Sequence, residues 1–116
     1  MGLRGWLHRF RQSDEDRRLG DIRAWANSVP GTTRIAESPH RTRTRVAGVV
    51  RRLTIKPGEE TLEAVVGDGT GEVRAVWTGR SFIPGLGLGT RVTLEGMLVE
   101  HGEHHRMVNP VYEFFS

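Results

Sequence analysis

The clearest alternation of apolar and polar positions runs through Leu62–Trp77, LEAVVGDGTGEVRAVW. In its second half Val73, Ala75 and Trp77 share one side, which is the period of a β-strand with two different faces. The DGTG segment at 68–71 interrupts the alternation, and its glycines supply the positive φ that tight turns require. The pattern predicts a β-hairpin with strands at about 61–67 and 72–78.

Three further apolar-rich stretches predict strands on either side of this hairpin, at about 46–55, 90–100 and 104–114. The inward positions expected in the first are Val46, Gly48 and Val50, then Leu53 and Ile55 after a register change. We expect the last strand to be broken at Asn109-Pro110, because proline cannot donate a hydrogen bond to the ladder. The glycine-rich stretch 80–89 predicts a loop or one helical turn that plugs the barrel end. Five short strands with this insert match the order of an OB-fold.

Before residue 31 the apolar spacing changes to that of a helix. A first stripe consists of Leu3, Trp6, Leu7 and Phe10, and its spacing predicts a helix over 2–11. Ser13 and the three acidic residues after it predict the start of a second helix, which Pro30-Gly31 ends. The apolar stripe of this second helix is Leu19, Ile22, Trp25, Ala26 and Val29. The first helix can pack on the barrel, dock a partner or lie on a membrane surface, and we expect packing or docking.

These patterns divide the 116 residues into three parts. Residues 1–31 form a helical segment, residues 32–44 a linker with Ile35-Ala36 as an apolar anchor, and residues 45–116 the barrel. The length suits one domain with a short appendage. The fold class predicted is mainly β, a five-stranded OB-fold Greek-key barrel with an N-terminal helical segment.

Composition narrows the classes further. The chain has no cysteine, which excludes disulfides and thiolate metal sites. No apolar run approaches the roughly 20 residues of a transmembrane helix, and residues 1–13 lack the apolar core of a secretory signal. We therefore expect a cytoplasmic protein without a membrane partner.

Charge is distributed unevenly along the chain, whose net charge is +3. Residues 1–58 hold 13 basic and 5 acidic residues, a net +8, whereas residues 59–116 hold 4 and 9, a net −5. All the basic residues except Lys56 are arginine. Arginine suits phosphate because its planar guanidinium binds bidentately, although a GC-rich genome produces the same bias.

Arg41, Arg43 and Arg45 alternate with threonines, so in an extended chain they point to one side. Such a row either follows phosphates or is a solvated approach to the first strand.

Candidate catalytic and metal chemistry is sparse. A zinc site could be drawn from His101, His104 and His105 with Glu100 and Glu103, but this segment is also a typical solvated hairpin tip, and we expect no metal and no cofactor. No Ser-His-Asp set, Walker loop or acid–base carboxylate pair is evident, so we predict a protein that is not an enzyme. Trp77 can stack a base, but its parity with Val73 and Ala75 favours the core.

Three segments, VAGVV, DGTGEVRAVW and GTRVTLEGML, together resemble the OB-folds of the anticodon-binding and RecG-type helicase wedge kind. The resemblance extends from Arg45 to Tyr112. The whole chain also resembles a group of small actinobacterial proteins described as OB-fold nucleic-acid-binding, which share a helical N-terminal segment, the VWTGR stretch and a closing NPxYE.

This resemblance implies a nucleic-acid partner, single-stranded DNA or RNA. In anticodon-binding relatives, residues at the positions of Arg52 and Arg74 contact the nucleic acid, whereas the aromatic residue often found on the second strand is replaced here by Glu63 and Val65. We therefore predict weak, backbone-directed binding. The candidate binding residues are Arg51, Arg52, Lys56, Arg74, Arg80 and Arg106. The alternative is a protein-interaction adaptor that uses residues 2–29 for docking and the barrel as a scaffold. The oligomeric state stays open.

Overall fold

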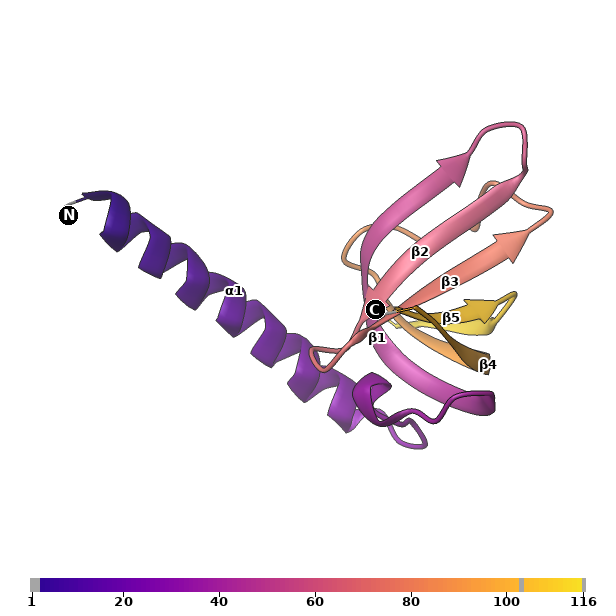
Figure 1. The fold of residues 1–116 in the computed structure, drawn as a ribbon, viewed down its shortest axis with the longest axis horizontal. Coiled ribbons are helices and arrows are strands. Elements are labelled where there is room, and N and C mark those ends of the chain that lie inside the picture. Colours follow the sequence, from indigo (N-terminus) through magenta and orange to yellow (C-terminus); the bar gives the residue numbers. More distant parts are fainter. Residues whose placement is uncertain (1–2, 103, 116) are drawn as a thin grey trace.

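The computed structural model describes residues 3–102 and 104–115, with side chains from Asp14 onward. Its elements are α1 (Leu3–Ser28), the 3-10 turn η1 (Ile35–Glu37), β1 (Thr42–Lys56), β2 (Thr61–Gly67), β3 (Glu72–Thr78), β4 (Arg91–His101), β5 (His104–Val108) and β6 (Val111–Phe115). The strands are ordered β1-β2-β3-β5-β4-β6, and β1 also pairs with β4, which closes the sheet (Figure 1). Together β5 and β6 form the predicted fifth strand, divided at Asn109-Pro110 as expected. The result is a mainly β chain whose barrel is an OB-fold.

The barrel core contains the residues predicted from the alternation in the hairpin. Val73 and Ala75 are fully buried and Trp77 is 3% exposed. The indole Nε1 of Trp77 donates a hydrogen bond to the carbonyl of Pro110 at 3.1 Å, which satisfies its polar atom inside the core. From the loop at 80–89, Ile83 is 1% exposed and joins the same core. The loop therefore plugs the barrel as predicted, and this described stretch contains no helical turn.

β1 serves both halves of the barrel, pairing first with β4 and then with β2. Its register shifts between Val50 and Arg52, as the apolar pattern predicted. A Cβ on Gly48 would lie 2.6 Å from the carbonyl oxygen of Gly67, so only glycine permits this close approach. The inward placement predicted for Ile55 is wrong, since its side chain is 56% exposed. Ile55 is the penultimate residue of β1, at a hairpin tip that extends past the barrel end (Figure 1).

The N-terminal segment is one continuous helix, and the predicted helix start at Ser13 is wrong. Asp14 instead pairs with Arg18 one turn later at 3.4 Å, an arrangement that supports a helix interior. The helix ends at Ser28, just before the predicted stop at Pro30. The side chains of Leu3, Trp6, Leu7 and Phe10 lie outside the described residues.

The C-terminal half of α1 packs on the barrel, whereas its N-terminal half projects away from it (Figure 1). The ring of Trp25 meets that of Phe115 edge-on with centroids 5.8 Å apart, and the Arg91 guanidinium lies over Trp25 at 5.4 Å. Arg23 Nη2 donates to the carbonyl of Gly69 at 2.8 Å. Trp25, from the apolar stripe expected in the second helix, therefore packs on the barrel.

The segment between α1 and β1 is tied to the hairpin turn. Ile35 is fully buried, and its backbone N–H donates to Asp68 Oδ2 at 2.9 Å. Asp68 Oδ1 also accepts hydrogen bonds from the backbone of Thr70 and Gly71. Ile35 is thus the predicted anchor, but Ala36 is exposed, and β1 begins at Thr42, inside the stretch expected to be a linker.

In the described part of the chain no helix combines the length and the apolar character needed to span a membrane.

Candidate nucleic-acid interface

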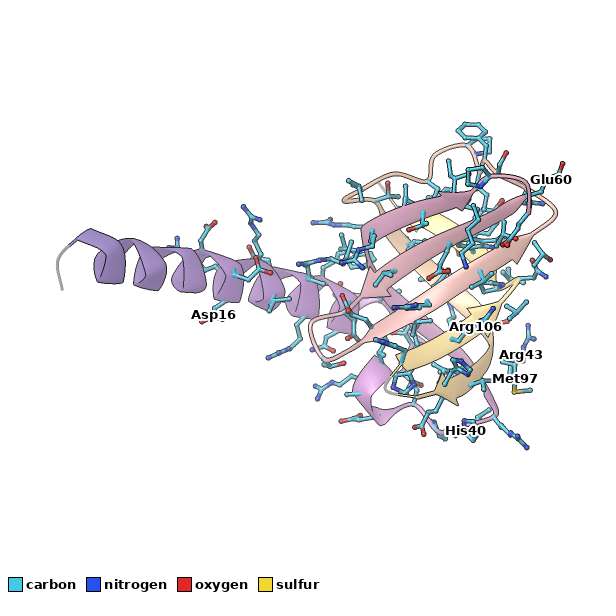
Figure 2. The ribbon with its side chains drawn as sticks, turned by 45° about the horizontal axis from the view of Figure 1, so that its top comes forward. Asp16, His40, Arg43, Glu60, Met97 and Arg106 are labelled. Atoms are coloured by element: carbon cyan, nitrogen blue, oxygen red, sulfur yellow. The ribbon has the colours of Figure 1, made fainter. Side chains whose placement is uncertain are left out.

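The candidate residues Arg52, Arg74 and Arg106 lie in one row across four neighbouring strands. In the register of the sheet Arg52 on β1 is opposite Val65 on β2, and Val65 is opposite Arg74 on β3. Arg74 in turn is level with Arg106 on β5, whose side chain stands on the outer surface in Figure 2. Because residues level with one another point to the same side of a sheet, the three guanidiniums share the outer face of β1, β2, β3 and β5.

A hollow of about 260 Å³ lies on this face around Val65. We call it the arginine hollow. Its lining residues are Arg51, Arg52, Val65, Glu72, Arg74 and His104. Arg51 reaches the same side as Arg52 because the β-bulge inserts one extra residue into β1, so the two consecutive side chains no longer alternate.

A second hollow of about 190 Å³ adjoins the first, since Arg74 and His104 line both. Its remaining lining residues are Lys56, Glu63, Val76, His101 and Arg106. The fold therefore gathers five of the six candidate residues on one surface. We call this surface the basic face and define it by Arg51, Arg52, Lys56, Arg74 and Arg106.

The sixth candidate, Arg80, lies apart from the basic face. It follows β3 in the loop to β4, where its Nη1 donates to the hydroxyl of Tyr112 at 3.3 Å. Its backbone N–H donates to the carbonyl of Glu60 at the β1–β2 tip, which is labelled in Figure 2. Arg80 lines neither hollow, so the structure does not group it with the other five.

Carboxylates offset part of the positive charge of the basic face. Glu63 lies 3.5 Å from Arg74 and 3.8 Å from Lys56, and Glu15 of α1 lies 3.1 Å from Arg51. Arg52 and Arg106 form no ion pair with any residue whose side chain is described. Two guanidiniums of the face are therefore not neutralised by a neighbouring carboxylate of the described chain.

Sequence reasoning missed three residues of this surface, His104, Glu72 and Glu15. His104 has the parity of Arg106 on the fifth strand, so the alternation of that strand already predicts that both side chains lie on one face. Glu72 begins β3 two residues before Arg74, so the same alternation predicts that these two side chains lie on one face. Glu15 had no such signal, because its contact with Arg51 depends on how α1 crosses the barrel.

The row of Arg41, Arg43 and Arg45 has a different environment. Arg43 pairs with Glu95 at 2.8 Å and Arg45 with Glu113 at 3.5 Å, so carboxylates on β4 and β6 accompany two of its three cations. Among residues 14–102 and 104–115 no group of three histidine or acidic side chains is placed to hold a metal ion. Glu103, a member of the zinc alternative, lies outside the described residues.

Comparisons with solved structures identify the same fold. The HINb domain of p204 aligns with a TM-score of 0.60 and 16% identity over 72% of this chain, which spans only 47% of that chain. The OB domain of MM0293 from Methanosarcina mazei aligns with a TM-score of 0.58 and 18% identity, over 73% of this chain and 83% of that one. An OBody bound to hen egg-white lysozyme aligns with a TM-score of 0.60 and 14% identity, over 76% and 98%. No family model and no curated protein matches the sequence.

Proposed function

We propose that the chain is a non-catalytic nucleic-acid-binding module that holds single-stranded DNA or RNA weakly, through its backbone, on the basic face. The observation that carries this proposal is the cross-strand row of Arg52, Arg74 and Arg106. OB-folds bind oligonucleotides on the face of their second and third strands, which is the face where this row lies.

The composition of the two hollows supports phosphate contact without base recognition. Their lining includes five cations, two carboxylates, Glu63 and Glu72, and two histidines, but no phenylalanine, tyrosine or tryptophan. Stacking on aromatic rings contributes roughly 1–3 kcal/mol per base in single-strand binding. Without it, affinity rests on charge-assisted contacts to phosphate, which fix position but carry no sequence information. We expect dissociation constants in the micromolar range or weaker at physiological salt.

The test is a titration of labelled single strands and duplexes of DNA and RNA at several salt concentrations. For single strands we expect the logarithm of affinity to fall with the logarithm of salt concentration by about 0.7 for each phosphate contact. The affinity should depend little on sequence. If no single strand or duplex binds at low salt, the proposal fails.

A second candidate function, a protein-interaction adaptor, is favoured by the course of α1. Its N-terminal half projects beyond the barrel (Figure 1), and the OBody neighbour is an OB-fold bound to a protein. In that case residues 2–29 would dock the partner. Under this adaptor function, deleting residues 1–12 would abolish partner binding but leave Trp25 on the barrel and the melting temperature unchanged. Under the first proposal, the same deletion would leave the nucleic-acid affinity unchanged.

A further inference from the structure

The arginine hollow differs from the rest of the basic face in the kind of cation that surrounds one small space. Arg51, Arg52 and Arg74 all line it, and His104 lies at its border with the second hollow. The second hollow also has three cations, Lys56 and Arg106 besides the shared Arg74, but only two of them are guanidiniums. Within the arginine hollow Arg52 is the guanidinium that no described carboxylate pairs, because Glu15 pairs with Arg51 and Glu63 with Arg74.

The volume of the hollow limits the group it can accept. At about 260 Å³ it is smaller than the roughly 300–1,000 Å³ typical of sites that enclose a whole small molecule. Its lining has only one apolar side chain, Val65, as a floor. A phosphate with its ribose suits such a space better than a base, which needs apolar or aromatic walls.

On the side toward α1, two carboxylates border the arginine hollow, and we call this its closed side. Glu15 of α1 lies 3.1 Å from Arg51, and Glu72 lines the hollow on β3. Beyond them α1 itself passes the hairpin, where Leu19 and Arg51 line one further hollow of about 230 Å³. A polynucleotide continuing in this direction would bring its next phosphate against these carboxylates, which like-charge repulsion opposes.

In the other direction the surface remains open to a strand. The second hollow follows directly, and its Arg106 and Lys56 can take the next phosphate. Neighbouring strands lie about 4.8 Å apart, so the row from β1 to β5 spans three such steps, enough for two or three phosphates of a single strand.

We propose that the arginine hollow holds the phosphorylated end of a single strand, a terminal phosphomonoester, with the chain leaving over Arg106. This inference rests on the proposed function and specifies its ligand. A terminal phosphomonoester carries about −1.5 to −2 charges at pH 7 and three strong acceptor oxygens, whereas an internal phosphodiester carries one. Several guanidiniums around one space favour the group with more charge and more acceptors.

The experiment measures the affinity of the full chain for one short single strand in three forms, with a 5′-phosphate, with a 3′-phosphate and with hydroxyls at both ends. One phosphorylated form should bind about tenfold more tightly than the hydroxyl form, the effect of one added charge-assisted contact. Equal affinity of all three forms, lost in Arg52→Ala, would overturn the inference but leave the proposed function intact. Absence of binding by all three would overturn both.

Two variants on the same face separate end recognition from general attraction. Arg52→Ala should lower the tenfold preference to about twofold, while Arg106→Ala, outside the hollow, should weaken the three forms equally. Loss of the preference in Arg106→Ala instead would contradict the placement of the end. Melting curves of both variants serve as the control for folding.

Glu15→Gln tests the closed side of the hollow. It should raise the affinity of the hydroxyl-ended strand more than that of the phosphorylated strand, because internal phosphates can then continue past Arg51. An unchanged ratio would contradict the role of Glu15.

A nucleoside monophosphate should compete only at much higher concentration, since it lacks the phosphates over Arg106. Competition at equal concentration would assign the hollow to a free phosphomonoester and overturn the assignment to a strand end.

Discussion

The barrel carries arginines on two outer surfaces, and the two sets have different surroundings. On the surface that the start of β1 forms with β4 and β6, Arg43 and Arg45 of β1 pair with Glu95 and Glu113 across the strands, and α1 packs nearby through Trp25. On the basic face Arg52 and Arg106 have no ion-pair partner among the described side chains, and the helix passes only its margin, at Arg51. The same residue type thus belongs to a compensated surface in one place and to a surface with excess charge in the other. The number of arginines alone does not distinguish the two surfaces, whereas the ion pairs that these arginines form do.

The largest expected effect compares the two arginine sets directly. The double variant Arg52→Ala/Arg74→Ala should weaken single-strand binding about 100-fold at low salt, because it removes two charge-assisted contacts. It should also flatten the salt dependence by about 1.4 in slope. The matched control Arg43→Ala/Arg45→Ala should change affinity less than about threefold, through long-range charge alone. Equal losses in both variants, measured by fluorescence anisotropy, would remove the distinction between the two surfaces.

The second prediction concerns the helix-covered side. Trp25→Ala removes the ring contact with Phe115 and the stacked Arg91 guanidinium. For a half-buried aromatic side chain we expect a loss of about 2 kcal/mol, which lowers the melting temperature by about 8 °C. Phe82→Ala is the control, since Phe82 is 72% exposed and should leave the melting temperature unchanged. If Trp25→Ala also has no effect, α1 is not held on the barrel by this contact.

The third prediction isolates the contact between α1 and the hairpin turn. Gly69 and Gly58 have φ values of +86° and +82°, but a Cβ on Gly69 would lie 2.7 Å from the carbonyl oxygen of Leu19, whereas one on Gly58 would meet nothing within 4 Å. Gly58→Ala should cost about 1 kcal/mol from the left-handed backbone alone. Gly69→Ala should cost about 1 kcal/mol more in chemical denaturation, since an overpacked contact adds to the strain. Equal losses in the free energy of unfolding would show that α1 can move away from residue 69 without destabilising the protein.

The smallest expected effect is on the compensated surface itself. Arg43→Ala breaks the 2.8 Å pair with Glu95, whose partners are 64% and 41% exposed. Exposed ion pairs of this kind contribute about 0–1 kcal/mol, so the free energy of unfolding should fall by less than about 0.5 kcal/mol. A larger loss in denaturant titrations would mean that this pair is structural and not merely compensating.

The sequence predicts most of the barrel, because strand alternation and turn chemistry are local signals. β2 and β3 begin and end where the DGTG hairpin placed them, and the break at Asn109-Pro110 follows from proline alone. The predicted helix start at Ser13 is wrong because acidic residues are as typical of i,i+4 ion pairs inside a helix as they are of its first turn. The grouping of Arg52, Arg74 and Arg106 was only partly predictable: parity gives the face, but the level of each residue depends on register. Neither the contact of Glu15 with Arg51 nor the separation of Arg80 has a local signal, since both depend on where distant segments cross.

The β-bulge in β1 has a consequence for how this chain tolerates changes of length. Val50 pairs with Val66 and Arg52 with Val65, so Arg51 is the residue without a place of its own in the ladder. Deleting one residue elsewhere between Val46 and Arg52 would shift the remaining strand by one position and turn its apolar side chains to the wrong face. Deleting Arg51 would leave every other pair of β1 with β2 in place. The bulge is thus a point where a deletion can remove a single positive charge while the barrel keeps its register.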